Sequence, residues 1–140
     1  MRWSDWAWTG LRWLFALFFF TTGLAIAAKV IFGVGDYIHQ PTAAAQALDT
    51  ALHQSGFMDP LIGASYLVGG AALAWRRSAP LGIILLGPTV VVIFFFDTFL
   101  ARLPIPGVLV LAFWGLLALR FLSAYRPLWT YGGDPAKART

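Results

Sequence analysis

The chain alternates between long apolar segments and short polar connections. Four segments consist almost entirely of aliphatic, aromatic and small residues, at about 11–33, 58–75, 80–101 and 104–125. A helix needs about 20 such residues to cross the roughly 30 Å hydrocarbon core of a bilayer, and each segment reaches or approaches that length. The pattern predicts an all-α integral membrane four-helix bundle, folded as a single domain over residues 1–140 with a flexible tail at 130–140.

The first connection is the only long one, and its pattern predicts a short amphipathic helix. Ala45, Leu48 and Leu52 recur at helical spacing within it. Thr42 is a suitable N-cap for such a helix, and Gly56 is a suitable C-terminal stop. An apolar stripe made mostly of alanine either lies on the membrane surface or covers the bundle, and the sequence leaves both alternatives open.

Basic residues predict how the four segments cross the membrane. Arg76 and Arg77 occupy the short second connection, just before Pro80 at the start of the third segment. One topology places eight basic residues on a single side: Arg2, Arg12, Arg76, Arg77, Arg120, Arg126, Lys137 and Arg139. Only Lys29 and Arg102 are left for the other side. Since basic residues accumulate on the cytoplasmic side, both termini and the second connection are predicted to be cytoplasmic.

Composition narrows the function classes. Hydrophobic residues make up 59% of the 140 residues and charged residues 11%, which excludes an ordinary soluble domain. The formal charge of +4 therefore reflects topology, and we expect no nucleic-acid partner. The chain has no cysteine, so a redox role would need a bound cofactor or a partner. No nucleotide-binding loop, zinc-type histidine pair or nucleophile elbow is present, and we predict no catalytic residue and no metal site.

Two charged residues lie inside the apolar segments, and they are the candidates for function. Lys29 and Asp97 each lie about 24 Å along their helix from its predicted cytoplasmic start, so they could meet in the outer third of the membrane. Tyr66 could add a hydroxyl to the same place. An ionised group in hydrocarbon costs at least a few kcal/mol and normally has a partner. In the alternative, Lys29 extends to the surface and Asp97 pairs with Arg102 or marks a helix end.

Small residues predict where the helices pack closely. The stretch GASYLVGG places Gly63, Gly69 and Gly70 in the second segment. Residues without a side chain allow the backbones of neighbouring membrane helices to approach each other. We therefore interpret these glycines as helix-packing positions.

The chain resembles the DoxX-like family of small four-helix bacterial membrane proteins from about Leu11 to Leu122. Arg12, Phe19 and Gly23 stand at the spacing of that family's arginine, aromatic residue and glycine. The stretch SGFMDPLIGASYLVGGAALAWRRSAPLGIILLGP has the family's succession of glycine pair, hairpin and PLG entry.

Three polar positions depart from the pattern of the family. Lys29 lies about one turn later than the usual lysine. Tyr66 replaces a frequent glutamate, and Asp97 replaces a frequent histidine. At the positions of Tyr66 and Asp97 a polar group is kept while its acid–base character changes, which weakens any transfer of quinone chemistry from the family.

The resemblance implies a multi-pass protein of the bacterial inner membrane, and two functions follow as hypotheses. The first is an accessory or assembly subunit of a larger redox or photosynthetic complex, held by membrane lipids and by other subunits or copies of itself. The second follows from relatives described as subunits of a thiosulfate:quinone oxidoreductase. It is a quinone- or lipid-binding component, with Lys29, Tyr66 and Asp97 lining a cavity and a quinone or lipid as the bound group.

Overall fold

The computed structural model describes residues 3–35 and 38–129, and this part of the chain is helical without a strand. The elements are α1 (Trp3–Phe32), α2 (Ala43–Gln54), α3 (Met58–Ala74), α4 (Ala79–Phe95), the π-helical turn η1 (Phe96–Leu100), α5 (Pro104–Arg120) and α6 (Leu122–Trp129). The all-helical prediction is confirmed. The tail predicted at 130–140 lies outside the described residues.

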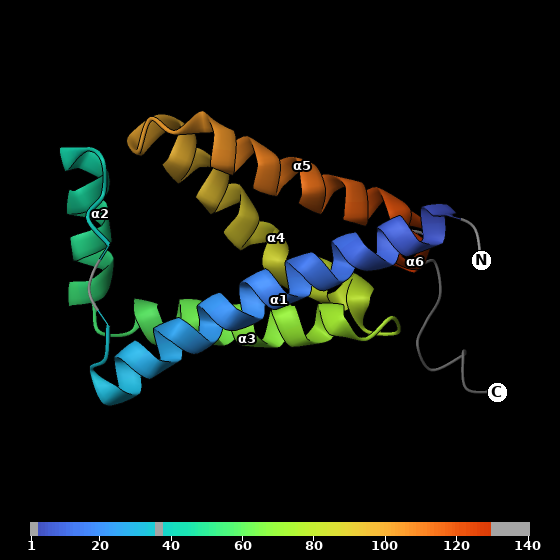
Figure 1. Cartoon of the computed structure of the whole chain (residues 1–140), viewed down its shortest axis with the longest axis horizontal. Coiled ribbons are helices and arrows are strands. Elements are labelled where there is room, and N and C mark those ends of the chain that lie inside the picture. The colour runs from blue at the N-terminus through green and yellow to red at the C-terminus, as the bar shows by residue number, and fades with distance from the viewer. Residues whose placement is uncertain (1–2, 36–37, 130–140) are drawn as a thin grey trace.

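The helices form two antiparallel pairs that meet at one end (Figure 1). Helices α1 and α3 lie side by side and share the most extensive contact in the molecule. Helix α4 leads away from the end of α3 and packs against α5. The start of α1, the α3–α4 turn and α6 lie at one end, and α2 lies across the other (Figure 1). The turn that carries Arg76 and Arg77 is therefore at the same end as the start of α1.

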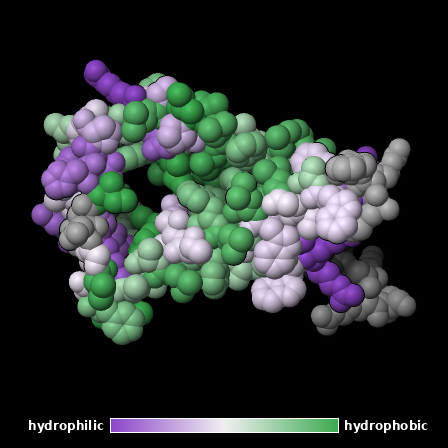
Figure 2. Space-filling view, viewed as in Figure 1, coloured by the Kyte–Doolittle hydropathy of each residue, from purple (hydrophilic) through white to green (hydrophobic). Residues whose placement is uncertain are grey.

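Two helices are by themselves long and apolar enough to cross a membrane: Asp5–Phe32, and α4 continued through η1 as Ala79–Leu100. Helices α3 and α5 have 17 residues each. Helix α3 is bent by 92° from α2, and α5 is bent by 74° from α6. The described residues thus contain two to four possible spans. Figure 2 shows hydrophilic residues toward both ends of the visible face and mainly apolar residues between them.

Two helices differ in extent from the predicted apolar segments. The first helix begins at Trp3 and not near residue 11, because nothing in the tryptophan-rich start breaks a helix and Asp5 in the first turn favours its positive end. The fourth helix ends at Arg120 and not near residue 125. There the Phe121 N–H is shared between the carbonyls of Leu117 and Ala118, at 3.2 Å each, a geometry typical of a helix end.

The amphipathic helix predicted in the first connection is confirmed as α2. Its N-cap is Thr42, whose side chain accepts a hydrogen bond from the Ala45 N–H at 3.1 Å. Gly56 has φ +76°, a left-handed conformation that glycine adopts at little cost after a helix. Ala45 is fully buried, so α2 packs on the bundle with its small-residue face. Of the two alternatives for this helix, the structure favours the one in which it covers the bundle.

Glycines set the spacing between the helices. A Cβ atom on Gly70 would lie 2.8 Å from the backbone N of Phe20, and one on Gly63 would lie 3.0 Å from the Ile26 side chain. A Cβ on Gly69 would lie 2.6 Å from the Leu86 side chain. All three predicted packing glycines therefore contact helices of the same chain. Around them lies the core, in which Phe19, Leu73, Ile83, Leu86, Val90 and Leu117 are almost completely buried.

Candidate functional site

The candidate site is centred on the π-helical turn η1, which contains Asp97. In this turn the Ala101 N–H donates to the Phe96 carbonyl at 2.9 Å, five residues back, and the Leu103 N–H donates to the Asp97 carbonyl at 2.7 Å. Single π-helical turns are rare and occur frequently at functional sites. The helix that carries Asp97 thus departs from α-helical geometry at that residue.

The structure brings Tyr66 and Asp97 together. Tyr66 is buried, and its ring meets the edge of Phe19 with the ring centres 5.1 Å apart. The side chain of Asp97 is half-buried and lies within electrostatic range of Tyr66. Helix α5 approaches the aspartate at Gly107, where a Cβ atom would be 3.0 Å from the Asp97 Cβ. Two of the three predicted site residues therefore share one region between α3, η1 and α5.

The third predicted residue, Lys29, lies farther toward the end of α1. Gly23 of α1 also packs at Tyr66, since a Cβ on it would be 3.0 Å from the Tyr66 Cβ. Lys29 is in the last turn of α1, six residues beyond Gly23 and so about 9 Å farther along the helix axis. Its side chain is half-buried. Along α1, Lys29 therefore lies beyond the level of Gly23 and Tyr66.

A hydroxyl group that the sequence did not single out belongs to the same turn. Thr98 Oγ1 is buried and has no hydrogen-bond partner within the described chain. By contrast, Thr21, Thr22 and Ser65 each donate to the carbonyl four residues earlier in their helices. Thr98, within the π turn, makes no such bond, and an unsatisfied buried hydroxyl costs about 1–3 kcal/mol. A polar atom of a bound molecule would recover this cost.

Helix α2 covers this end of the bundle and is fixed near both of its own ends. At its start, Thr42 Oγ1 donates to the Leu100 carbonyl of η1 at 2.5 Å. Near its other end, His53 hydrogen-bonds to Asp59 at the start of α3, and its Nε2 lies 3.5 Å from Asp49. Figure 2 shows an opening between α2 and the rest of the molecule, bordered mainly by apolar residues on the side of the bundle. The candidate site thus combines a few polar groups, apolar walls and a helical cover.

No cluster of three or more histidine, aspartate or glutamate side chains in the described ranges could hold a metal ion. Comparison with known proteins adds no assignment, because no family model, curated protein or solved structure matches the chain. The resemblance to the DoxX-like family therefore stays a prediction.

Proposed function

We propose that the chain is a DoxX-like, four-span protein of the bacterial inner membrane that binds the polar head of a quinone or a lipid around Asp97 and Tyr66. The observation that carries this proposal is the π turn beneath α2, where Asp97, Tyr66 and the unsatisfied Thr98 hydroxyl belong to one region of an otherwise apolar bundle. Ligand sites typically combine mostly apolar walls with a few polar groups that fix orientation. Both termini are cytoplasmic in this proposal, and the site belongs to the outer leaflet.

The polar groups suit the head of such a molecule. Hydroxyls of Tyr66 and Thr98 can donate to a quinone carbonyl or an ester carbonyl, and the Asp97 carboxylate can accept from a quinol hydroxyl. Exposed Phe95 and Phe99 stack at 5.7 Å on the surface of the same helix and offer a path for an apolar tail. Because the chain has no cysteine, electrons would pass between the quinone and a partner oxidoreductase.

The test is to identify what the protein retains. The protein would be purified in a mild detergent, and its quinones and lipids would be extracted and quantified by mass spectrometry. We expect a stoichiometric quinone or lipid that is lost in Asp97→Asn and reduced in Thr98→Val. The matched control is Thr21→Val, because the Thr21 hydroxyl already donates to a carbonyl within α1. Equal retention by wild type and Asp97→Asn would overturn the proposal.

A second function is favoured by the lipid-facing surface of α1. Large side chains on this helix are exposed, among them Leu17 at 55%, Phe18 at 50% and Leu24 at 49%. An apolar surface of this kind can pack against a helix of another subunit, as an accessory or assembly role requires. Affinity purification in mild detergent followed by mass spectrometry tests this role. We expect a reproducible companion subunit, and a chain that always purifies alone would contradict the accessory role.

A further inference from the structure

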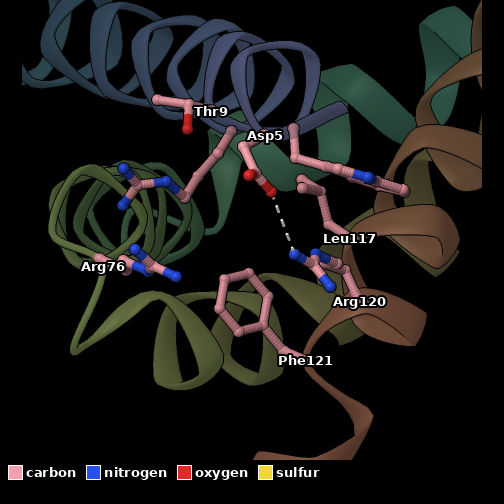
Figure 3. A pocket seen from close by; sticks show the side chains of 8 residues that line it. Asp5, Thr9, Arg76, Leu117, Arg120 and Phe121 are labelled. Carbon is pink, nitrogen blue, oxygen red and sulfur yellow. Dashed lines mark ion pairs between the residues drawn. The ribbon is translucent and has the colours of Figure 1, made fainter. Parts of the chain in front are cut away.

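A second cavity lies at the opposite end of the molecule from Asp97, where α1, α5 and the α3–α4 turn meet. Its volume is about 510 Å³, within the range of small-molecule sites. Three arginines and one aspartate line it: Arg12 and Asp5 from α1, Arg76 from the turn and Arg120 from α5. Figure 3 shows Arg76 and Arg120 on opposite sides of this space, with Asp5 and Thr9 directed toward it from α1. We call this space the arginine pocket.

Two of the three guanidinium groups are held in place by contacts within the protein. Arg12 is only 8% exposed, and its Nη1 donates to the carbonyls of Leu73 at 3.1 Å and Ala74 at 3.0 Å. Arg120 lies 3.6 Å from the Asp5 carboxylate and 6.0 Å from the centre of the Trp8 ring. The pocket is therefore partly preorganised before any ligand arrives.

The charges of the arginine pocket do not balance. Asp5 is the only carboxylate among its described lining residues, and it is engaged by Arg120. The contacts of Arg12 are to backbone carbonyls, which carry no net charge, and Arg12 and Arg76 repel each other. An anion between these groups would relieve the repulsion and would use the remaining N–H donors. Planar guanidinium groups match phosphate oxygens especially well.

The surroundings of the pocket indicate how such an anion would be carried. Apolar side chains line the pocket together with the charged ones, namely Trp8, Leu117 and Phe121. Apolar side chains within a charged pocket suit a molecule that joins a phosphate to acyl chains. Basic pockets between membrane helices on the cytoplasmic side are typical binding sites for anionic headgroups. A freely soluble phosphate would gain nothing from this apolar border.

We infer that the arginine pocket binds the phosphate of an anionic phospholipid in the cytoplasmic leaflet, between the guanidinium groups of Arg76 and Arg120. The lipid would join α1 to α5, two helices that otherwise touch little. The inference rests on the proposed membrane orientation and is independent of the ligand at Asp97. Asp5 competes with the phosphate for Arg120, so it sets the affinity of the pocket.

The experiment compares lipids with the same acyl chains. Purified protein in detergent would be mixed with equal amounts of phosphatidylglycerol and phosphatidylcholine, and bound lipid would be counted by native mass spectrometry. We expect preferential retention of phosphatidylglycerol by the wild type. In the double variant Arg76→Gln/Arg120→Gln, retention should fall by about tenfold or more. The matched control is Arg77→Gln, which removes a guanidinium from the same turn but not from the pocket and should retain lipid like the wild type.

A variant that should increase lipid retention separates an effect on binding from an effect on stability. Asp5→Asn removes the competing carboxylate and should increase phosphatidylglycerol retention, whereas a purely structural role for the Asp5–Arg120 pair predicts a decrease or no change. Equal retention of the two lipids, or unchanged retention in the double variant, would overturn the inference.

A competition experiment distinguishes a lipid phosphate from a soluble phosphate as the bound group. Inorganic phosphate at millimolar concentration should leave bound phosphatidylglycerol in place. Displacement that depends on Arg76 and Arg120 would overturn the assignment to a lipid, and the pocket would then be assigned to a soluble phosphate compound. Asp97→Asn should retain phosphatidylglycerol like the wild type, so failure of the outer site and failure of this pocket are separate results.

Discussion

Thr42 Oγ1 and the Leu100 carbonyl are joined by a hydrogen bond of 2.5 Å between residues 58 positions apart. The same hydroxyl oxygen accepts the Ala45 N–H at 3.1 Å. One side chain therefore begins α2 and also fixes it to the π turn that contains Asp97. The position of α2 over the candidate site and the shape of that site therefore both depend on Thr42.

Replacing Thr42 by valine should loosen α2 without changing the size of the side chain. The substitution removes an N-cap and a long-range hydrogen bond, which together stabilise α2 by about 1–3 kcal/mol. Hydrogen exchange measured by mass spectrometry should show faster exchange over residues 43–54. Thr50→Val is the control, because Thr50 is an exposed residue of the same helix. Equal exchange in the two variants would contradict a capping and tethering role.

Replacing Arg12 by glutamine should destabilise the end of α3. The last carbonyls of a helix have no partner within it, and Arg12 satisfies those of Leu73 and Ala74. Loss of these charge-assisted bonds should lower the free energy of unfolding by about 1.5–3 kcal/mol, as measured by thermal unfolding in detergent. Arg77→Gln should unfold like the wild type, and a loss of the same size in both variants would argue against a specific contact of Arg12.

Adding a methyl group at Gly70 should be destabilising, because the nearest atoms belong to the α1 backbone, which cannot turn away. The new Cβ would lie 2.8 Å from the Phe20 N and 3.0 Å from the Ala16 carbonyl oxygen. Gly70→Ala should therefore cost about 1–3 kcal/mol in thermal or denaturant unfolding. Gly115→Ala is the matched control, since a Cβ there meets nothing within 4 Å and alanine favours a helix over glycine. Similar losses in both variants would refute this account of the α1–α3 contact.

The absence of cysteine makes the proposed topology directly measurable. Single cysteines would replace the exposed residues Arg77, in the α3–α4 turn, and Gln54, at the end of α2. A membrane-impermeant thiol reagent added to intact cells should label Gln54→Cys and should label Arg77→Cys only after the cells are opened. Labelling of both residues from outside would contradict four crossings with a cytoplasmic hairpin.

The sequence predicted the helices that depend on interactions between residues close to each other in the chain. Thr42 caps the start of α2 with its side chain, and Gly56 adopts the left-handed conformation that follows its end. The apolar runs indicate helices of sufficient length. The break at Phe121 was missed because no glycine or proline stands between Gly115 and Pro127, so nothing in the sequence marks the turn of the backbone. The early start of α1 was missed because tryptophan is equally suited to a helix and to an interfacial segment.

The candidate site was predictable only in part. Asp97 and Tyr66 stand out as polar residues in apolar segments, and their proximity follows from the packing of the helices. The π turn depends on a choice between hydrogen bonds four and five residues apart, which no residue type determines, so Thr98 gave no signal. The arginine pocket was missed because Arg12, Arg76 and Arg120 were interpreted only as topology signals. The signal that could have revealed it is that Arg12 stands nine residues inside a helix beginning at Trp3.

The unequal lengths of the helices have a consequence for the surrounding bilayer. Helices α3 and α5 have 17 residues each, which corresponds to about 25 Å, whereas the hydrocarbon core measures roughly 30 Å. On the proposed four-span topology, lipid beside these two helices must become thinner, while lipid beside the longer α1 need not. The protein would then thin its membrane beside α3 and α5 but not beside α1, and this uneven mismatch would attract short-chain lipids and other short helices to α3 and α5.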